Sequence, residues 1–353
     1  MSHSIRFCRS ADGVRIAFAA AGGGPPLLQT PTWMTHLELD WECRAWRPWL
    51  DELTARHTVV RYDLRGCGLS DRDVEAQSLD SWVADLEAVV DAAGLERFPV
   101  FGLCQGAAIA AAYAARHPER VSRLVLYGSY AQGALARRSA AAADEATALG
   151  TLIETGWGRP VRAFREMFAS LLMPDAHPET VRSLAEMERH SAAPAMARRL
   201  WLAFHGVDIT GAAPEILAPT LVAHCRHDAM VPFDEGRRVA MLVPGARFVA
   251  LEGCNHILQP EEPCWGRLWD EVHEFLAEGA PVAAPGPRTF ADLTRREREV
   301  LGLVARARSN GEIAETLAIS PKTVRNHITR IFGKLGVSRR AEAIVIAREA
   351  GLR

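Results

Sequence analysis

The chain has 353 residues, of which 48% are hydrophobic and 24% are charged, and its formal net charge is −2. This balance is typical of a globular protein with a sizeable core, and it excludes a disordered, collagen-like or small disulfide-stapled chain. At roughly 100–200 residues per domain, the length predicts two domains. Taken for the whole chain, a net charge near zero argues against a nucleic-acid partner.

Membrane and redox signals in the sequence predict a cytoplasmic protein. No apolar run approaches the roughly 20 residues that a membrane span needs, and residues 1–6 lack the apolar core of a signal peptide. The seven cysteines are scattered, odd in number and without a C-x-x-C pair, a pattern typical of a reducing compartment. We therefore expect no membrane partner, no metal and no cofactor.

A stretch rich in proline and glycine divides the chain. Residues 279–287 hold three prolines and two glycines, which neither a helix nor a central strand tolerates. We interpret 279–289 as a linker between a domain at 1–278 and a second domain at 290–353. Residues 288–353 contain 14 Lys and Arg against 7 Asp and Glu, a net charge of +7, whereas the rest carries 27 against 36, a net charge of −9. The near-neutral total is therefore the sum of an acidic and a basic domain.

Strands and helices alternate over most of the first domain. Helical periodicity is clear at 78–93, 105–116 and 261–277. Short apolar or alternating runs predict seven strands, at Val14–Ala20, Pro26–Gln29, Thr58–Tyr62, Pro99–Leu103, Val121–Leu126, Thr220–Ala223 and Arg247–Ala250. This rhythm predicts an α/β fold with a doubly wound, mostly parallel sheet.

Residues 130–213 interrupt the alternation. They contain helical segments rich in aromatic and branched side chains, notably Trp157, Phe164, Phe168, Leu172, Trp201 and Phe204. Each of these side chains, taken singly, is best explained as part of an ordinary helical core. An insertion of this kind between two strands is, as a whole, typical of a helical lid over the sheet.

Three positions in this domain carry side chains suited to nucleophilic chemistry. Cys104 is the centre of a G-x-C-x-G between a predicted strand and a predicted helix, where a sharp turn needs small neighbours. A helix N-terminus favours the thiolate form of such a cysteine. Asp228 follows a predicted strand, and His256 lies in a loop before the last helix of the domain. A histidine oriented by a carboxylate can take the proton of a thiol.

The order nucleophile, acid, histidine resembles that of the α/β-hydrolase fold family. The segment Arg61–Asp71 and the turn Thr30–Trp33 resemble the family as well, and the resemblance spans about residues 5–278. It implies a catalytic triad and an oxyanion hole built from two backbone N–H groups. The implied triad is Cys104, Asp228 and His256, and the implied oxyanion donors are Trp33 and Gln105.

This chain departs from the family at two points. Cysteine replaces the usual serine, as in dienelactone hydrolases, and Pro31-Thr32 stands where the family usually has His-Gly. The residues alone leave other interpretations open: Cys104 as a buried core cysteine, Cys104 as a redox sensor without an adjoining second cysteine, and hydrolase-like domains that bind without reacting. A metal site at His205, His224, His227 and Asp228 and a dinucleotide loop at Gly66-x-Gly68 are the least favoured.

Four short helices are predicted in residues 290–353. Thr294 and Glu297 form a capping box at the start of the first, Asn310 caps the second, and Ser320-Pro321 begins the third. The third helix would bury Val324, Ile328, Ile331 and Leu335. The fourth helix, 339–350, is apolar over more than one face, which favours a contact with another subunit.

The second and third of these helices match helix-turn-helix logic, in which the second element enters the major groove. A solvated basic face on a structural bundle would show the same spacing. The letters L-T-x-R-E-x-E-V-L, S-N-x-E-I-A, S-x-K-T-V-x-N-H, I-x-x-K-L-G-V and R-x-x-A closely resemble the LuxR-type (GerE-like) DNA-binding domain. That resemblance implies base contacts from Arg325, Asn326 and Thr329, phosphate contacts from Lys322, Thr323 and Lys334, and a homodimer through the last helix.

Together the two resemblances predict a transcription regulator. The C-terminal domain would bind double-stranded DNA, and the hydrolase-like domain would bind a small hydrophobic or ester-, lactone- or thioester-like ligand under its lid. Covalent capture of an electrophile by Cys104 is a variant of this hypothesis. The alternative is a cysteine-dependent hydrolase that carries a DNA-binding domain.

Overall fold

A computed structural model describes residues 4–137, 139–157, 159, 161–278, 293–306, 308–317, 319 and 320, together with positions 323, 324, 327, 328, 331, 343, 344 and 347. It divides into two compact units, residues 1–278 and 279–353. The predicted linker at 279–289 lies outside the described residues.

Eight strands form one sheet in the first unit, in the order β1-β2-β4-β3-β5-β6-β7-β8. The contacts β1–β2 and β2–β4 are antiparallel, and all the others are parallel. The strands are β1 Arg6–Arg9, β2 Arg15–Gly22, β3 Pro26–Gln29, β4 Thr58–Tyr62, β5 Phe98–Leu103, β6 Val121–Tyr127, β7 Thr220–Cys225 and β8 Arg247–Leu251. The predicted mostly parallel α/β sheet is confirmed, with β1 added at one edge.

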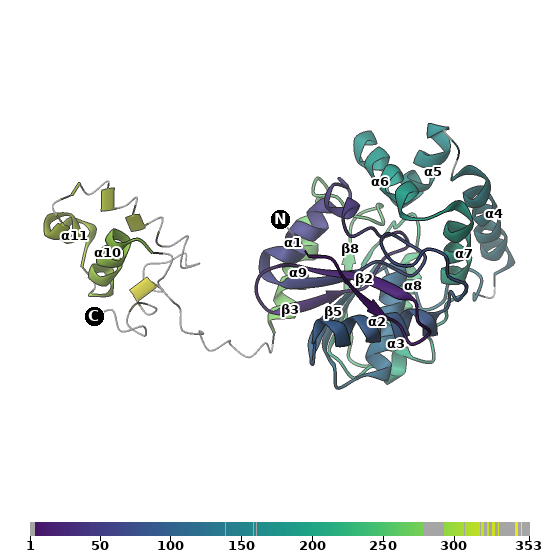
Figure 1. Cartoon of the computed structure of the whole chain (residues 1–353), viewed down its shortest axis with the longest axis horizontal. Helices are drawn as coiled ribbons and strands as arrows, with labels where there is room; N and C mark the ends of the chain where they lie inside the picture. The colour runs from purple at the N-terminus through teal and green to yellow at the C-terminus, as the bar shows by residue number, and fades with distance from the viewer. Residues whose placement is uncertain are drawn as a thin grey trace. The chain divides into compact units, whose positions relative to one another are not determined.

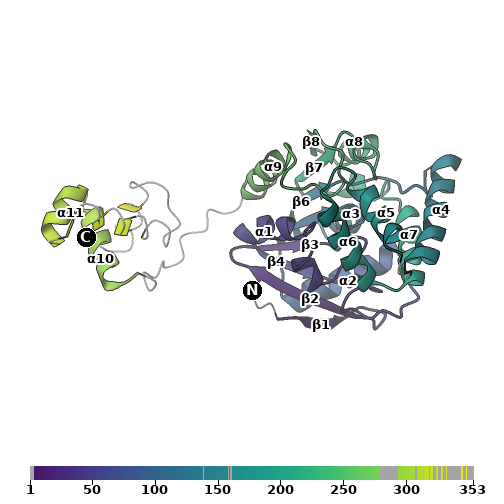
Figure 2. The same ribbon diagram turned by 90° about the horizontal axis from the view of Figure 1, so that it is seen from above.

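Helices cover both faces of this sheet (Figures 1 and 2). On one face lie α1 (Arg47–Arg56) and α9 (Trp265–Ala277), joined by the indole of Trp49, whose ring centre is 5.5 Å from that of Trp265. On the other face lie three helices, α2 Leu79–Ala93, α3 Gln105–Arg116 and α8 Phe233–Leu242. The sequence did not predict α1 or α8, which are only ten residues long.

Four further helices occupy the insertion between β6 and β7. They are α4 Ala140–Gly156, α5 Arg162–Leu172, α6 Pro178–Ser191 and α7 Pro194–His205, gathered together in Figure 1. Within this lid α4 packs on α7, and α5 packs on α6. The lid is tied to the loop after β3 by Trp33, whose ring centre lies 5.4 Å from Trp157 and 5.2 Å from Trp201.

A buried ionic cluster fixes the segment after β4. The guanidinium of Arg65 is fully buried and bonds both carboxylate oxygens of Asp85, at 2.7 and 2.5 Å, and Asp12 at 2.6 Å. Removing one partner of such a buried pair typically costs about 3–5 kcal/mol. The same segment places the Cys67 sulfur 3.9 Å from the Trp33 carbonyl, so the cluster helps to position the loop after β3.

The second unit has its own small core. Its helices are α10 (Arg295–Ala305), which begins after Thr294 as predicted, and α11 (Asn310–Leu317). Asn310 was predicted to cap α11, but it is the first residue of the helix, and Ser309 is the cap: Glu312 N–H donates to Ser309 Oγ at 3.3 Å, and Ser309 N–H donates to Glu312 Oε2 at 2.7 Å. The capping box is confirmed: Glu297 N–H donates to Thr294 Oγ1 at 3.2 Å, and Thr294 N–H donates to Glu297 Oε2 at 2.8 Å. The buried residues are Leu293, Val300, Leu301, Val304, Ala305, Ile313, Ala314, Val324, Ile331, Ala343 and Ala347.

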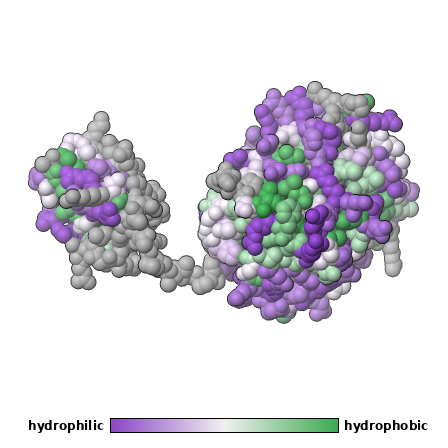
Figure 3. Space-filling model, in the orientation of Figure 1, coloured by the Kyte–Doolittle hydropathy of each residue, from purple (hydrophilic) through white to green (hydrophobic). Residues whose placement is uncertain are grey.

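The surface of the first unit is mixed. On the face shown in Figure 3, hydrophilic residues surround a hydrophobic area. Within the described part of the chain, no helix is both long enough and apolar enough to cross a membrane.

Candidate active site

Cys104 occupies a strained turn between β5 and α3. Its backbone has φ +53° and ψ −120°, and among the described residues it is the only non-glycine with a positive φ. A Cβ on Gly102 would lie 2.7 Å from the Ala107 Cα, and one on Gly106 would lie 2.5 Å from the Pro31 carbonyl. Both glycines of the G-x-C-x-G are therefore required by close packing. Strain of this kind persists only where the surroundings hold it.

Hydrogen bonds hold this turn from three sides. Cys104 N–H donates to the Tyr127 carbonyl at 2.9 Å, and Ala107 N–H donates to the Cys104 carbonyl at 3.0 Å. The Thr30 hydroxyl donates to the Gly106 carbonyl at 2.8 Å. These bonds join β6, α3 and the loop after β3, so the thiol is fixed by the body of the sheet. Only 4% of Cys104 is exposed.

Asp228 lies in the loop after β7 and accepts bonds on both carboxylate oxygens. Oδ1 accepts from the N–H groups of Met230 and Val231, each at 2.9 Å. Oδ2 lies 2.7 Å from Nδ1 of His256. Burial would raise the pKa of this carboxyl, but the positive charge of His256 and these hydrogen bonds outweigh burial and hold the pKa below its usual value. Asp228 is thus an ionised partner for His256.

His256 lies in the loop after β8 and is also buried. Its backbone N–H donates to the Leu172 carbonyl at 2.8 Å. A Cβ on Gly128 would lie 2.8 Å from the ring Cε1 of His256. Burial would lower the pKa of His256, but the charges of Asp228 and Cys104 outweigh burial and raise the pKa well above its usual value. Nε2 is buried and has no hydrogen bond of regular geometry among the described residues, and it belongs to the same small hollow as Cys104.

Gln105 and Trp33, predicted as oxyanion donors, lie beside this array. Gln105 is the first residue of α3, so its N–H has no acceptor within the helix. Trp33 follows β3 in the loop that Gly106 contacts. Trp33, Gln105, Cys104 and His256 share the wall of one small hollow of about 20 Å³. Because Asp228 contacts His256, the structure brings together all five predicted residues: Trp33, Cys104, Gln105, Asp228 and His256.

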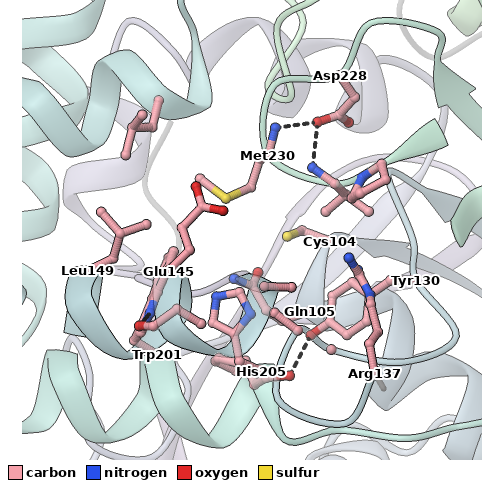
Figure 4. Close-up of a pocket in the computed structure, with 18 of the residues that line it drawn as sticks. Cys104, Gln105, Tyr130, Arg137, Glu145, Leu149, Trp201, His205, Asp228 and Met230 are labelled. Atoms are coloured by element: carbon pink, nitrogen blue, oxygen red, sulfur yellow. Dashed lines mark hydrogen bonds between the residues drawn. The ribbon is translucent and has the colours of Figure 1, made fainter. Parts of the chain in front are cut away.

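A larger cavity of about 470 Å³ opens on the other side of Cys104. In Figure 4, Cys104 and Gln105 lie between Asp228 and the lid residues Trp201 and His205. Most of the wall is apolar and comes from the lid and from the loop after β7: Ala134, Ala142, Ala146, Leu149, Leu171, Trp201, Phe204, Met230, Val231 and Pro232. A cavity of this size and lining suits a small, largely apolar molecule.

Three polar residues line this cavity besides Cys104, Gln105, Tyr130 and Asp228: Arg137, Glu145 and His205. Burial together with the charge of Arg137 lowers the pKa of His205 to about 4. His205 is therefore neutral at pH 7. The sequence did not single out Arg137 or Glu145, because no local pattern distinguishes a cavity-facing polar residue from one on a solvated helix face.

The remaining histidines do not assemble a metal site. His224 Nε2 bonds the Val231 carbonyl at 3.0 Å and lies 3.5 Å from Asp228. Across the residues that the structure describes, no group of three or more His, Cys, Asp or Glu side chains could hold a metal ion.

Of the residues predicted to contact DNA, the structure describes Thr323. Thr323 N–H donates to the Ser320 hydroxyl at 3.1 Å, which caps the start of the third helix. Ile328 packs against a core that includes Val324 and Ile331, as predicted. Five further predicted contact residues lie outside the described residues: Lys322, Arg325, Asn326, Thr329 and Lys334.

Two family models match this chain, one in each unit. Residues 25–263 match the family described as alpha/beta hydrolase fold. Residues 291–347 match that of bacterial regulatory proteins of the luxR family.

Curated relatives match the first unit. A putative carbamate hydrolase, RutD, from Azorhizobium caulinodans is 31% identical over 226 residues, covering 62% of this chain and 81% of that protein. A 2-hydroxymuconate semialdehyde hydrolase from a Pseudomonas species is 29% identical over 289 residues, covering 77% of this chain and 94% of that protein.

Solved structures agree on the fold. A hydrolase from Pseudomonas aeruginosa superposes with a TM-score of 0.63 at 24% identity, covering 78% of this chain and 98% of the other. An enol-lactonase from Burkholderia xenovorans gives 0.61 at 21% identity, covering 77% and 100%. The chain therefore belongs to the α/β-hydrolase fold family, and it carries at its C-terminal end a DNA-binding helix-turn-helix domain of the luxR family.

Proposed function

We propose that this protein is a ligand-responsive, DNA-binding transcription regulator. The carrying observation is the fusion itself: one chain joins a luxR-family domain to a domain with a 470 Å³ apolar cavity beside Cys104. A protein that acted only on a metabolite would have no evident use for a basic, groove-reading domain. Ligand binding would alter DNA affinity through the arrangement of domains or subunits.

The DNA-binding half is tested with the full chain and a selection from random duplexes. Arg325→Ala is expected to weaken the affinity for the enriched duplex by about 1–3 kcal/mol and to relax the base preference. Lys334→Ala should instead lower affinity for all duplexes and reduce the salt slope by about 0.9. Arg298→Ala, an exposed position of α10, is the control. An unchanged affinity in Arg325→Ala would remove the base-reading assignment.

The ligand-binding half is tested by DNA affinity with and without defined probes. Ethyl hexanoate and δ-decanolactone represent the ester and lactone classes that an apolar cavity favours. A coupled sensor should shift its DNA affinity by about 5-fold or more on saturation, since coupling energies are typically about 1–3 kcal/mol. Native mass spectrometry of the purified protein reports the subunit count, expected to be two, and any retained molecule. Unchanged DNA affinity with a demonstrably occupied cavity would overturn the sensor proposal.

A cysteine hydrolase is the second candidate, and the His256–Asp228 contact of 2.7 Å beside Cys104 favours it. The relevant assay follows p-nitrophenyl acetate with the wild type, Cys104→Ala and Cys104→Ser. Continuous turnover that Cys104→Ala abolishes supports the enzyme. A single burst of one acyl group per chain, without turnover, supports covalent capture by a sensor.

A further inference from the structure

Glu188 carries a buried carboxyl and is not part of the predicted triad of Cys104, Asp228 and His256. It lies on the lid helix α6, is 3% exposed, and its Oε2 has no hydrogen-bond partner in the described part of the chain. Burial raises its pKa to about 8. A buried polar group without a partner is costly, so Oε2 calls for a partner that the described residues do not supply.

The hollow that Glu188 lines adjoins the nucleophile. It measures about 20 Å³ and is shared with Cys104, Gln105 and His256. Cys104 and Gln105 also line the 470 Å³ cavity, so these two residues form the common wall of both spaces. A volume of this size holds one water-sized group. The hollow therefore has room for a single small polar group, and the larger cavity adjoins it.

We propose that Glu188 binds the ammonium group of a primary amine, on a ligand whose apolar part fills the larger cavity. A carboxylate and an ammonium form a strong charge-assisted hydrogen bond when both are desolvated. The hollow is walled by the indoles of Trp33 and Trp46, and aromatic rings attract cations. This inference rests on the proposed ligand-binding function and names the class of ligand.

Charge and size argue against the other ligand classes. The titratable groups that share the hollow with Glu188 are Cys104 and His256, and His256 is already paired with Asp228. A ligand carboxylate would meet a buried acid and no free cation. A quaternary ammonium or a guanidinium is larger than one water-sized group. A ligand carbonyl, accepting from the protonated acid, or a bound water are the outcomes that the test separates from an amine.

The test compares hexylammonium chloride with 1-hexanol by isothermal titration calorimetry on the full chain at pH 7. The two probes share an apolar tail and differ in the group offered to Glu188. We expect the amine to bind at least 10-fold more tightly than the alcohol, and Glu188→Gln to remove this preference. Equal affinities in the wild type, the result for a hollow that holds only water or a carbonyl, would overturn the proposal.

Two variants locate the amine. Glu145→Gln removes the lid carboxylate that lines the larger cavity beside Asp228, and it should keep the preference. If Glu145→Gln loses the preference and Glu188→Gln keeps it, the amine binds in the larger cavity and the proposal is wrong.

Proton release gives a readout in the unaltered protein. Binding of an ammonium ionises Glu188, so titrations at pH 7 in buffers of different ionisation enthalpy should show nearly one proton released per amine and none for 1-hexanol. An amine that binds without releasing a proton contradicts the proposal. Failure of the regulator proposal looks different: the amine binds as expected but leaves the DNA affinity unchanged.

Discussion

Two carboxyl groups near Cys104, those of Asp228 and Glu188, are both buried but differ in their hydrogen-bond partners and in their pKa. Asp228, in the loop after β7, takes bonds from two backbone N–H groups and from His256. Glu188, on the lid helix α6, has an oxygen with no partner in the described residues. The pKa of Asp228 lies below its usual value, and that of Glu188 is raised to about 8. The charge of His256 and the hydrogen-bond donors around Asp228, rather than the depth of burial, therefore decide which of the two carboxyls is ionised at pH 7.

The difference follows from the elements that carry the two side chains. A loop at the carboxyl end of a parallel strand has free backbone N–H groups that a nearby carboxylate can collect. In the middle of a helix those groups are already bonded within the helix, so a side chain there depends on what packs against it. Glu188 lies eleventh in a helix of 14 residues, and its Oε2 has no partner among the described residues. On the sheet side of the site, both oxygens of Asp228 therefore have hydrogen-bond partners. On the lid side, the Glu188 oxygen without a partner is the one that we propose binds a ligand.

The largest predicted effect comes from removing the satisfied carboxyl. Asp228→Ala leaves His256 buried without its charge partner, which should cost about 3–5 kcal/mol of unfolding free energy. The pKa of His256 should fall, because the Asp228 charge is the largest influence that raises it. Alkylation of Cys104 by iodoacetamide at pH 7, followed by mass spectrometry, should slow, because a neutral His256 no longer favours the thiolate. The exposed Asp234→Ala on α8 is the control, and equal rates in both variants would contradict the assignment.

Removing the unsatisfied carboxyl should have the opposite sign. The folded state holds the proton of Glu188 up to about pH 8, whereas the unfolded chain releases it near 4.5. The wild type therefore loses stability as pH rises between these values. Glu188→Gln lacks this loss, so its advantage in unfolding free energy should grow by about 3 kcal/mol between pH 5 and pH 8.

The same helix offers a matched control for that measurement. Glu186 is half exposed, and its pKa is lowered to about 2, chiefly by a hydrogen bond from Arg189. Both its folded and its unfolded pKa lie below pH 5, so between pH 5 and pH 8 the stability difference of Glu186→Gln should change only through its exposed contact with His190, 3.1 Å away, by about 1 kcal/mol or less. Urea unfolding at the two pH values measures both variants. A Glu188→Gln difference that stays flat would place the acid in contact with water.

Much of the sheet side was predictable from the sequence, because it rests on local rules. The strands β3 and β4 and the helix α3 have their predicted bounds, since short apolar runs and the G-x-C-x-G leave few other readings. Strand β1 was missed: its sequence, Arg-Phe-Cys-Arg, is mostly exposed, and pairing with β2 rather than burial keeps it in the sheet.

The lid side was predictable only in outline. Periodicity indicates helices and places their apolar stripes, but it does not say which helix faces the nucleophile. Glu188 lies in a stretch of charged residues, Glu186 to Arg189, that is typical of a solvated helix surface. It lines a hollow together with Trp33, Trp46 and Ile257, each more than 60 residues away in sequence. No local signal carries that information.

The sheet side is also less tolerant of added volume. Gly106→Ala would place a methyl group 2.5 Å from the Pro31 carbonyl and 2.8 Å from the Thr30 hydroxyl, displacing the loop that carries Trp33. We expect a loss of about 1–3 kcal/mol of unfolding free energy, as for overpacked cores, and slower acylation of Cys104. Gly23→Ala, where a Cβ would meet nothing within 4 Å, is the control for both measurements. Equal stability in the two variants would show that the loop yields.

The smallest predicted effect separates donor number from burial. Ser78 caps α2 much as Asp228 caps its own loop, accepting from the Ser81 N–H at 3.2 Å, but Ser78 is exposed. Water can replace its oxygen, so Ser78→Ala should cost only about 1 kcal/mol of unfolding free energy. The same thermal or urea unfolding experiment then ranks Asp228→Ala above Ser78→Ala by about 2 kcal/mol or more. If the two variants lose similar unfolding free energy, then burial and the His256 charge add nothing to the contribution of Asp228, and its backbone N–H donors alone account for that contribution.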